Sequence, residues 1–143
     1  MAYNDLQSKA EAAAKSVVDA LSLSGVTVTT GADDDAIVLP AVHCVCEGLA
    51  EVEGLIGTGL YRGALRIRVK SNANDTTLVA HRARVAAVFD ALAIDTLKAS
   101  LSSAVADFTC VFAGQLRQEQ AVSDGQSWTS DLLVDGIFCA SDV

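Results

Sequence analysis

The segment YRGALRIRVKS, residues 61–71, alternates between apolar and cationic side chains more regularly than any other part of the sequence. The apolar positions are Leu65, Ile67 and Val69, and the cationic positions are Arg66, Arg68 and Lys70. Because successive side chains of a β-strand point to opposite faces, this pattern predicts a strand with one buried and one charged face. Such a strand belongs in an antiparallel sheet that packs one face on a core and leaves the other toward water.

Two other segments have the period of amphipathic helices. Residues 4–23, which Asn4 or Asp5 can cap, carry an apolar stripe formed by Leu6, Ala10, Ala13, Val17 and Leu21. Residues 76–93, with Asp75 as the expected cap, carry a second stripe formed by Leu78, Val85, Phe89 and Leu92. A weaker pattern over residues 97–105 indicates one or two further helical turns.

The remaining segments predict four more strands. They cover residues 25–31, a stretch that opens after Pro40, residues 108–116 and residues 127–141. We therefore expect one domain over residues 1–143 with an α+β fold, in which a mainly antiparallel sheet of four to five strands carries two long helices packed on one face. The second face of this sheet, with Arg66 and Arg68, is then open unless another surface covers it.

The composition predicts a packed core without membrane-spanning segments. Hydrophobic residues make up 51% of the chain but aromatic residues only 5%, so the core must consist mostly of Val, Leu, Ile and Ala. No segment reaches the roughly 18 uncharged apolar residues of a membrane helix, and the N-terminus lacks the apolar stretch of a secretion signal. We therefore expect a protein of the cytoplasm with four reduced thiols, Cys44, Cys46, Cys110 and Cys139.

The sequence shows no set of residues suited to metal binding or to a phosphate loop. His43, Cys44 and Cys46 resemble ligands, but residues two apart on a strand stand ~6.6 Å apart, and structural zinc sites take their thiolates from tight turns. We therefore expect the cysteines to fill the core. The glycines of GLIGTG, residues 54–59, fit a hairpin turn, because a phosphate loop needs a lysine and a following helix.

Catalytic residues are also not evident. His81 lies at the border of the second helical stripe and is expected to pack there instead of acting as a base. The three carboxylates of Asp33–Asp35 are expected to form a solvated loop. We expect no enzymatic activity, no catalytic residues, no bound metal and no cofactor.

Charge is distributed very unevenly along the chain. Residues 54–100 carry a net charge of +4, whereas residues 1–53 carry −7 and residues 101–143 carry −5, for a total of −8. Six of the ten basic residues lie close together, at Arg62, Arg66, Arg68, Lys70, Arg82 and Arg84. Such a chain does not fit generic nucleic-acid binding, which requires a basic domain. Either the cluster is a solvated surface, or it attracts an acidic surface of another copy or of a partner.

The segment GTGLYRGALRIRVKSNANDTTLVAHRARVAAVFDAL, residues 57–92, resembles tail terminator (tail completion) proteins of long-tailed bacteriophages. The shared pattern is an early proline before a strand, a glycine-flanked strand with arginines, a short Asn/Asp loop and a helix with His81, Val85 and Leu92 in fixed spacing. The late segment DGQSWTSDLLVDGIF, residues 124–138, is similar to the end of that family. The resemblance covers roughly residues 5–141.

The resemblance implies a structural virion protein and not an enzyme. Members of the tail terminator family form a hexameric ring that ends the growth of the tail tube and joins the tail to the head. The implied partners are other copies of the chain, the tail tube protein and a head completion or neck protein. The implied location is the tail or neck of a virion assembled in the cytoplasm of a host bacterium.

Five residues are the candidates for contacts in such a ring: Arg62, Arg66, Arg68, Lys70 and Trp128. The cations can meet a neighbouring copy, or they can line the central channel and contact DNA phosphates without reading sequence. Trp128 can be an interface anchor or a lid on the core. Two other functions stay open: another neck component, such as a head completion or connector protein, and a small-ligand-binding α+β domain that uses His43 and the thiols.

Overall fold

The computed structural model describes residues 3–23, 25–31, 40–53, 59–74, 76–123 and 125–140. Within these ranges the chain forms three helices, which are α1 (Tyr3–Asp19), α2 (Leu78–Leu92) and α3 (Leu97–Ala104). It also forms six strands, which are β1 (Thr27–Thr30), β2 (Ala41–Glu51), β3 (Leu60–Asn72), β4 (Phe108–Gln118), β5 (Val122–Ser123) and β6 (Ser127–Ala140). The fold is α+β, as the sequence predicts.

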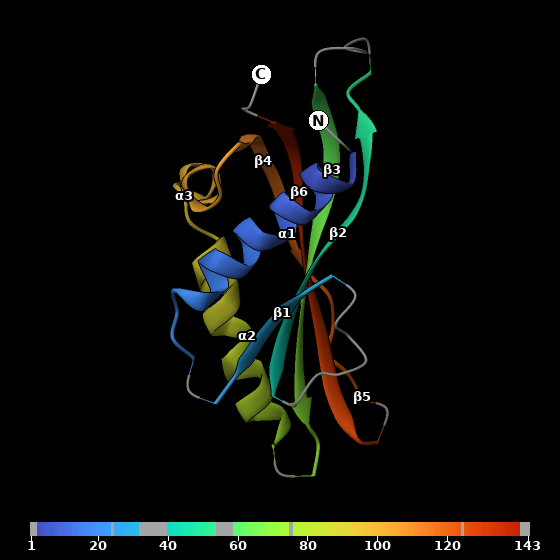
Figure 1. Ribbon diagram of the computed structural model, residues 1–143. Coiled ribbons are helices and arrows are strands. Elements are labelled where there is room, and N and C mark those ends of the chain that lie inside the picture. Colours follow the sequence, from blue (N-terminus) through green and yellow to red (C-terminus); the bar gives the residue numbers. More distant parts are fainter. Residues whose placement is uncertain are drawn as a thin grey trace.

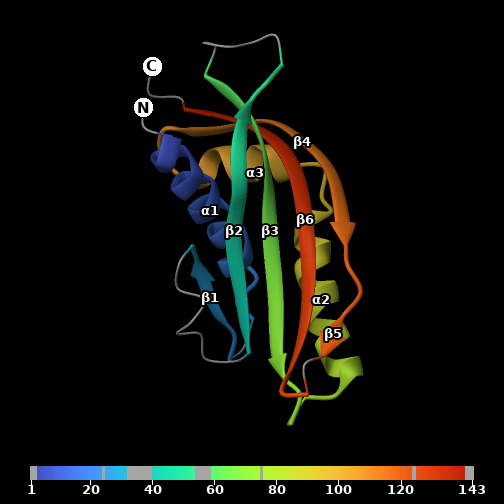
Figure 2. The same cartoon turned by 90° about the vertical axis from the view of Figure 1, so that its right-hand side faces the viewer.

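The six strands form one mixed sheet with the order β1-β2-β3-β6-β4, and β5 also pairs with β6. The two long central strands, β3 and β6, pair antiparallel without interruption from Leu60–Cys139 to Asn72–Ser127. The β2–β3, β4–β6 and β5–β6 pairs are antiparallel, and only β1–β2 is parallel. Figure 2 shows this order with β1 and β4 at opposite edges.

All three helices lie on one face of the sheet, and α1 crosses it diagonally (Figure 1). The opposite face, which is turned toward the viewer in Figure 2, carries none of these three helices and is called the open face below. The helix-covered face holds the core, in which α1 and α3 meet inward side chains of the four long strands. The prediction that the helices share one face is therefore confirmed.

The structure differs from the prediction in its number of strands and helices and in its mixed sheet. The pair of β1 and β2 is parallel and not antiparallel, because the start of β2 lies beside the start of β1, and residues 31–40 separate the two strands along the chain. The strand β5 has only two residues and lies in a polar stretch without alternation. The third helix, α3, corresponds to the weaker pattern at 97–105.

The ends of two helices also differ from the prediction. Helix α1 ends at Asp19 instead of residue 23, because the chain turns at Ser22, which has a positive φ of 51°. The cap of α2 is Thr77, whose side chain accepts a hydrogen bond from the Ala80 amide. Asp75, the cap expected from the sequence, lies outside the described residues.

Side chains from the helices cover part of both sheet edges. On β2, the Gln7 side-chain amide donates to the Cys46 carbonyl (2.7 Å), and the Glu11 carboxylate accepts from the Cys46 amide (2.9 Å). On β4, the Ser102 hydroxyl meets both the amide (3.0 Å) and the carbonyl (3.3 Å) of Cys110. These contacts occupy backbone groups that would otherwise be free to pair with another strand.

Candidate functional site

The even-numbered residues of β3 lie on the open face. Leu65, Ile67 and Val69 are at most 2% exposed and lie in the core. Because β3 pairs with β6 without a bulge, the alternation holds along the whole strand, and Arg62, Arg66, Arg68 and Lys70 share the opposite side. The structure thus confirms the two-faced strand predicted from the alternation.

Asp131 on β6 holds two of these arginines. In the strand register it lies directly opposite Arg68, whose Nε and Nη2 donate to its two carboxylate oxygens at 2.9 and 3.2 Å. The Arg66 Nη1 group donates to the same carboxylate at 2.7 Å. Only 9% of the Asp131 side chain is exposed, so the carboxylate depends on these charge-assisted contacts for its stability.

Glu47 on β2 gives Arg66 a second carboxylate partner. Its Oε1 atom forms an ion pair with Arg66 Nε, although the contact lacks the geometry of a good hydrogen bond. The contact with Glu47 is the largest influence that raises the pKa of Arg66 above its ordinary value, and Asp131 adds to it. The result is a cluster in which β2 and β6 each supply a carboxylate to the central strand between them.

The basic residues that are close in sequence do not form one basic surface. Arg82 and Arg84 belong to α2, on the other side of the sheet from Arg66 and Arg68. On the open face itself, Glu47 and Asp131 neutralise Arg66 and Arg68. The remaining two cations of β3, Arg62 and Lys70, make no ion pair with any other described residue, and they lie toward opposite ends of the strand.

The open face is hollowed on both sides of Arg68. One hollow, of about 390 Å³, is lined by Gly31, His43, Val45, Glu47, Arg66 and Arg68. The other, of about 320 Å³, is lined by Arg68, Lys70, Glu119, Gln120, Val122, Thr129 and Asp131. Both hollows mix cations with carboxylates, which suits a protein surface of mixed charge better than a site for a single anion.

His43 and the two neighbouring cysteines point to opposite faces of β2. The His43 ring lies on the open face, where Nδ1 meets the Thr29 hydroxyl (2.7 Å) and Nε2 meets the Gly31 carbonyl (2.8 Å). Cys44 and Cys46 lie in the core, where burial raises the pKa of each thiol to about 12. The three side chains therefore do not converge, and no group of metal-binding side chains occurs among the residues that the structure describes.

The thiols fill the core as predicted in three of the four cases. Cys44, Cys46 and Cys110 are at most 1% exposed, whereas Cys139 is half-buried and lies on the open side of β6. All four are free thiols.

Trp128 packs on the helix-covered face and not beside the arginines. It pairs with Ser71 in the register, and its indole Nε1 donates to the Thr76 carbonyl at 3.0 Å, next to the start of α2. The side chain is half-buried and ties β6 to the segment before α2. It therefore acts as a lid at this end of the core, while a contact of its exposed part with a neighbouring copy stays a prediction.

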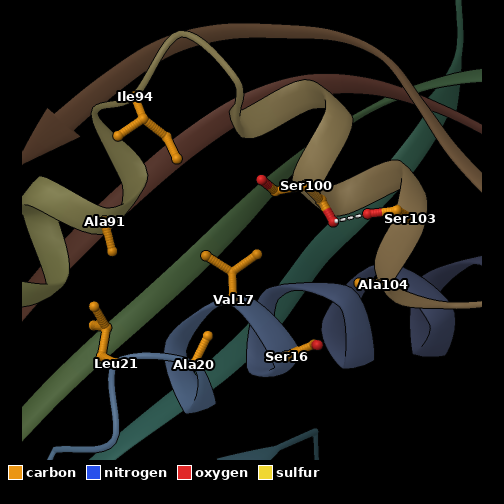
Figure 3. A pocket seen from close by; sticks show the side chains of 9 residues that line it. All are labelled: Ser16, Val17, Ala20, Leu21, Ala91, Ile94, Ser100, Ser103 and Ala104. Carbon is orange, nitrogen blue, oxygen red and sulfur yellow. Dashed lines mark hydrogen bonds between the residues drawn. The ribbon is translucent and has the colours of Figure 1, made fainter.

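A groove between the helices was not anticipated from the sequence. It has a volume of about 560 Å³ and is lined by Ser16, Val17, Ala20, Leu21, Ala91, Ile94, Ser100, Ser103 and Ala104. Figure 3 shows Val17 of α1 pointing into the space below α3. None of these residues is charged, so the groove offers no acid or base. The many Ala and Ser residues of the three helices are the only sequence signal for it.

Several sequence features lie wholly or partly outside the described residues. They include the Asp33–Asp35 run and all of the GLIGTG segment except Gly59, so the expected loop and turn stay predictions. None of the described helices is both long and apolar enough to span a bilayer.

Comparisons with known proteins do not place the chain in a family. No protein-family model matches it, and no curated protein matches it.

Proposed function

We propose that this protein is a tail terminator, a ring-forming structural protein that caps a phage tail tube and joins it to the head or neck. The proposal rests on the sequence resemblance of residues 57–92 and 124–138. The observation in its favour is the open face of the sheet, where Arg62 and Lys70 remain as cations without an ion pair among the described residues.

A ring of identical subunits requires one surface of each copy to bind a different surface of the next copy. The chain has the charge asymmetry for such a contact, since the segments before and after residues 54–100 are strongly acidic. In our proposal Arg62 and Lys70 attract an acidic surface of the adjacent subunit. The Arg66–Arg68–Asp131–Glu47 cluster keeps the face between them rigid and close to neutral.

We assign the open face to a contact between subunits and not to DNA. The carboxylates Glu47 and Asp131 lie among its arginines, and Asp135 points to the same side of β6. Phosphate groups would be repelled by these acids, whereas a protein surface of mixed charge can complement them. Other neck proteins of phages would use the same kind of contact, so the position in the virion needs a test of its own.

Electron microscopy of phage tails provides that test. Tails are assembled from the tube proteins of the same phage, with and without this protein. With the protein we expect tubes of one length that carry a collar at the end that joins the head. Without it we expect tubes of uncontrolled length.

Two results would contradict the assignment. Tubes of uniform length in the absence of the protein would exclude a terminator. If tubes assembled without the protein are of uniform length but fail to join heads, the protein is a different neck component.

A further inference from the structure

His81 is one of four buried side chains through which α2 docks, together with Val85, Val88 and Leu92. Its ring is fully buried. Nδ1 lies 2.8 Å from the Ser71 hydroxyl of β3, and Nε2 lies 2.9 Å from the Ser130 hydroxyl of β6. One imidazole thus connects the first turn of the helix to both central strands of the sheet.

The neighbouring Arg84 favours one direction of these hydrogen bonds. Its Nη1 group donates to the Ser71 oxygen, and this positive charge favours a hydroxyl that donates its own hydrogen to His81 Nδ1 over one that accepts a second N–H group. The ring hydrogen of a neutral His81 is then on Nε2 and is donated to Ser130. In this state every polar atom of the buried ring has a partner.

A second proton on His81 does not fit this arrangement. It would place an N–H group against the Ser71 oxygen that already accepts from Arg84, and it would bring two positive charges to one hydroxyl. The partners on β3 and β6 are both neutral serines, and among the described residues Arg84 is the charged group that shifts this histidine. Burial first, and then the charge of Arg84, lower the pKa of His81 below the ordinary 6.5.

We propose that His81 is an acid-sensitive latch, which holds α2 on the sheet while its ring is neutral and releases the helix when the ring is protonated. The sign follows from linkage. Because the folded state binds the proton less readily than the unfolded or released state, the latch is fully effective above pH 6.5. It weakens as the pH falls from 6.5 toward the lowered pKa. This inference does not depend on the proposed function.

His43 provides a control within the same chain. Its Nε2–H donates to the Gly31 carbonyl, and its other partner is the Thr29 hydroxyl. No arginine among the described residues donates to that hydroxyl. His43 therefore lacks the cation at its partner hydroxyl that His81 has, although its ring is almost as buried as that of His81.

Hydrogen–deuterium exchange of the intact protein tests the latch. Protection factors are compared above and below pH 6.5 for peptides from α1, α2 and α3. We expect the protection of α2 to fall first, by about tenfold for each unit by which the pKa of His81 is lowered. In H81Q, which keeps a neutral side chain that can donate to Ser130, this fall should disappear, whereas in H43Q it should remain.

Two outcomes would overturn the proposal. One is a wild-type protein in which α2 keeps its protection through this range. The other is a fall that is the same in α1, α2 and α3, which would indicate general acid unfolding. Since H81Q could fail to fold, the wild-type comparison among the three helices decides the matter alone.

Discussion

At the scale of single residues, Asp131 is the most important charged group of the open face. A lone carboxylate with 9% exposure would be unfavourable, but it receives hydrogen bonds from Arg66 and from two nitrogens of Arg68. The two guanidinium groups in turn are about one third exposed or less. Each member of the cluster therefore depends on the others.

We expect the substitution D131N to destabilise the fold by about 1–3 kcal/mol, because it leaves two partly buried arginines without their shared counter-charge. Urea unfolding measures the effect. D135N is the control, since Asp135 is on the same strand and face and has no ion pair with another described residue. Equal stability of the two variants would show that the cluster contributes nothing.

The cysteines lead to a second prediction at this scale. Burial raises the pKa values of Cys44 and Cys46 to about 12 and also raises that of Cys110, so these thiols stay protonated and unreactive. Burial also raises the pKa of Cys139, but this thiol is only half-buried and a reagent can reach it, so below pH 9.0 we expect an alkylating reagent to modify Cys139 more than about tenfold faster than the other three.

Mass spectrometry of the labelled peptides measures these rates. The raised pKa values of Cys44 and Cys46 also contribute to the free energy of unfolding. This contribution is complete below pH 9.0 and is lost as the pH rises from 9.0 toward 12. Rapid labelling of Cys44 or Cys46 in the native protein would contradict their placement in the core.

At the scale of elements, the sheet depends on helix side chains that cover its edges. Glu11 and Gln7 of α1 bind the backbone of Cys46 on β2, and Ser102 of α3 binds the backbone of Cys110 on β4. These contacts hold two helices in place, and they also block the strand edges over the core.

Removal of one such contact should be measurable. We expect S102A to lower the free energy of unfolding by about 1–3 kcal/mol, because the amide of the buried Cys110 loses its partner. S103A is a matched control, since the Ser103 hydroxyl bonds only the Ser100 carbonyl of its own helix, and its effect should stay within ~0.5 kcal/mol. Equal effects of the two substitutions in thermal or urea unfolding would contradict a role for Ser102 at the edge.

At the scale of the whole molecule, the sequence predicted the layers better than the pairing. The alternation of Leu65 to Lys70 correctly predicted the two faces of β3, because a period of two allows only one arrangement. The parallel β1–β2 pair and the short β5 were missed, since nothing local distinguishes a returning connection from a hairpin.

The same limit applies to the candidate site. The sequence placed Arg66 and Arg68 on the open face, but their partner Asp131 lies more than sixty residues away along the chain. Only strand register brings these residues together. For the same reason the network of His81 with Ser71 and Ser130 could not be recognised from helical spacing alone.

The proposed ring depends on Arg62 and Lys70, and light scattering during size-exclusion chromatography tests this dependence most directly. The variant R62E/K70E changes the two cations of β3 that make no ion pair with another described residue, and R82E/K98E makes the same change in charge on α2 and α3, on the other side of the sheet. We expect the wild type and R82E/K98E to have the mass of a closed ring, expected to be a hexamer, and R62E/K70E to have that of a monomer. A wild-type monomer at every concentration and salt tested, or a ring that R62E/K70E leaves intact, would contradict the account.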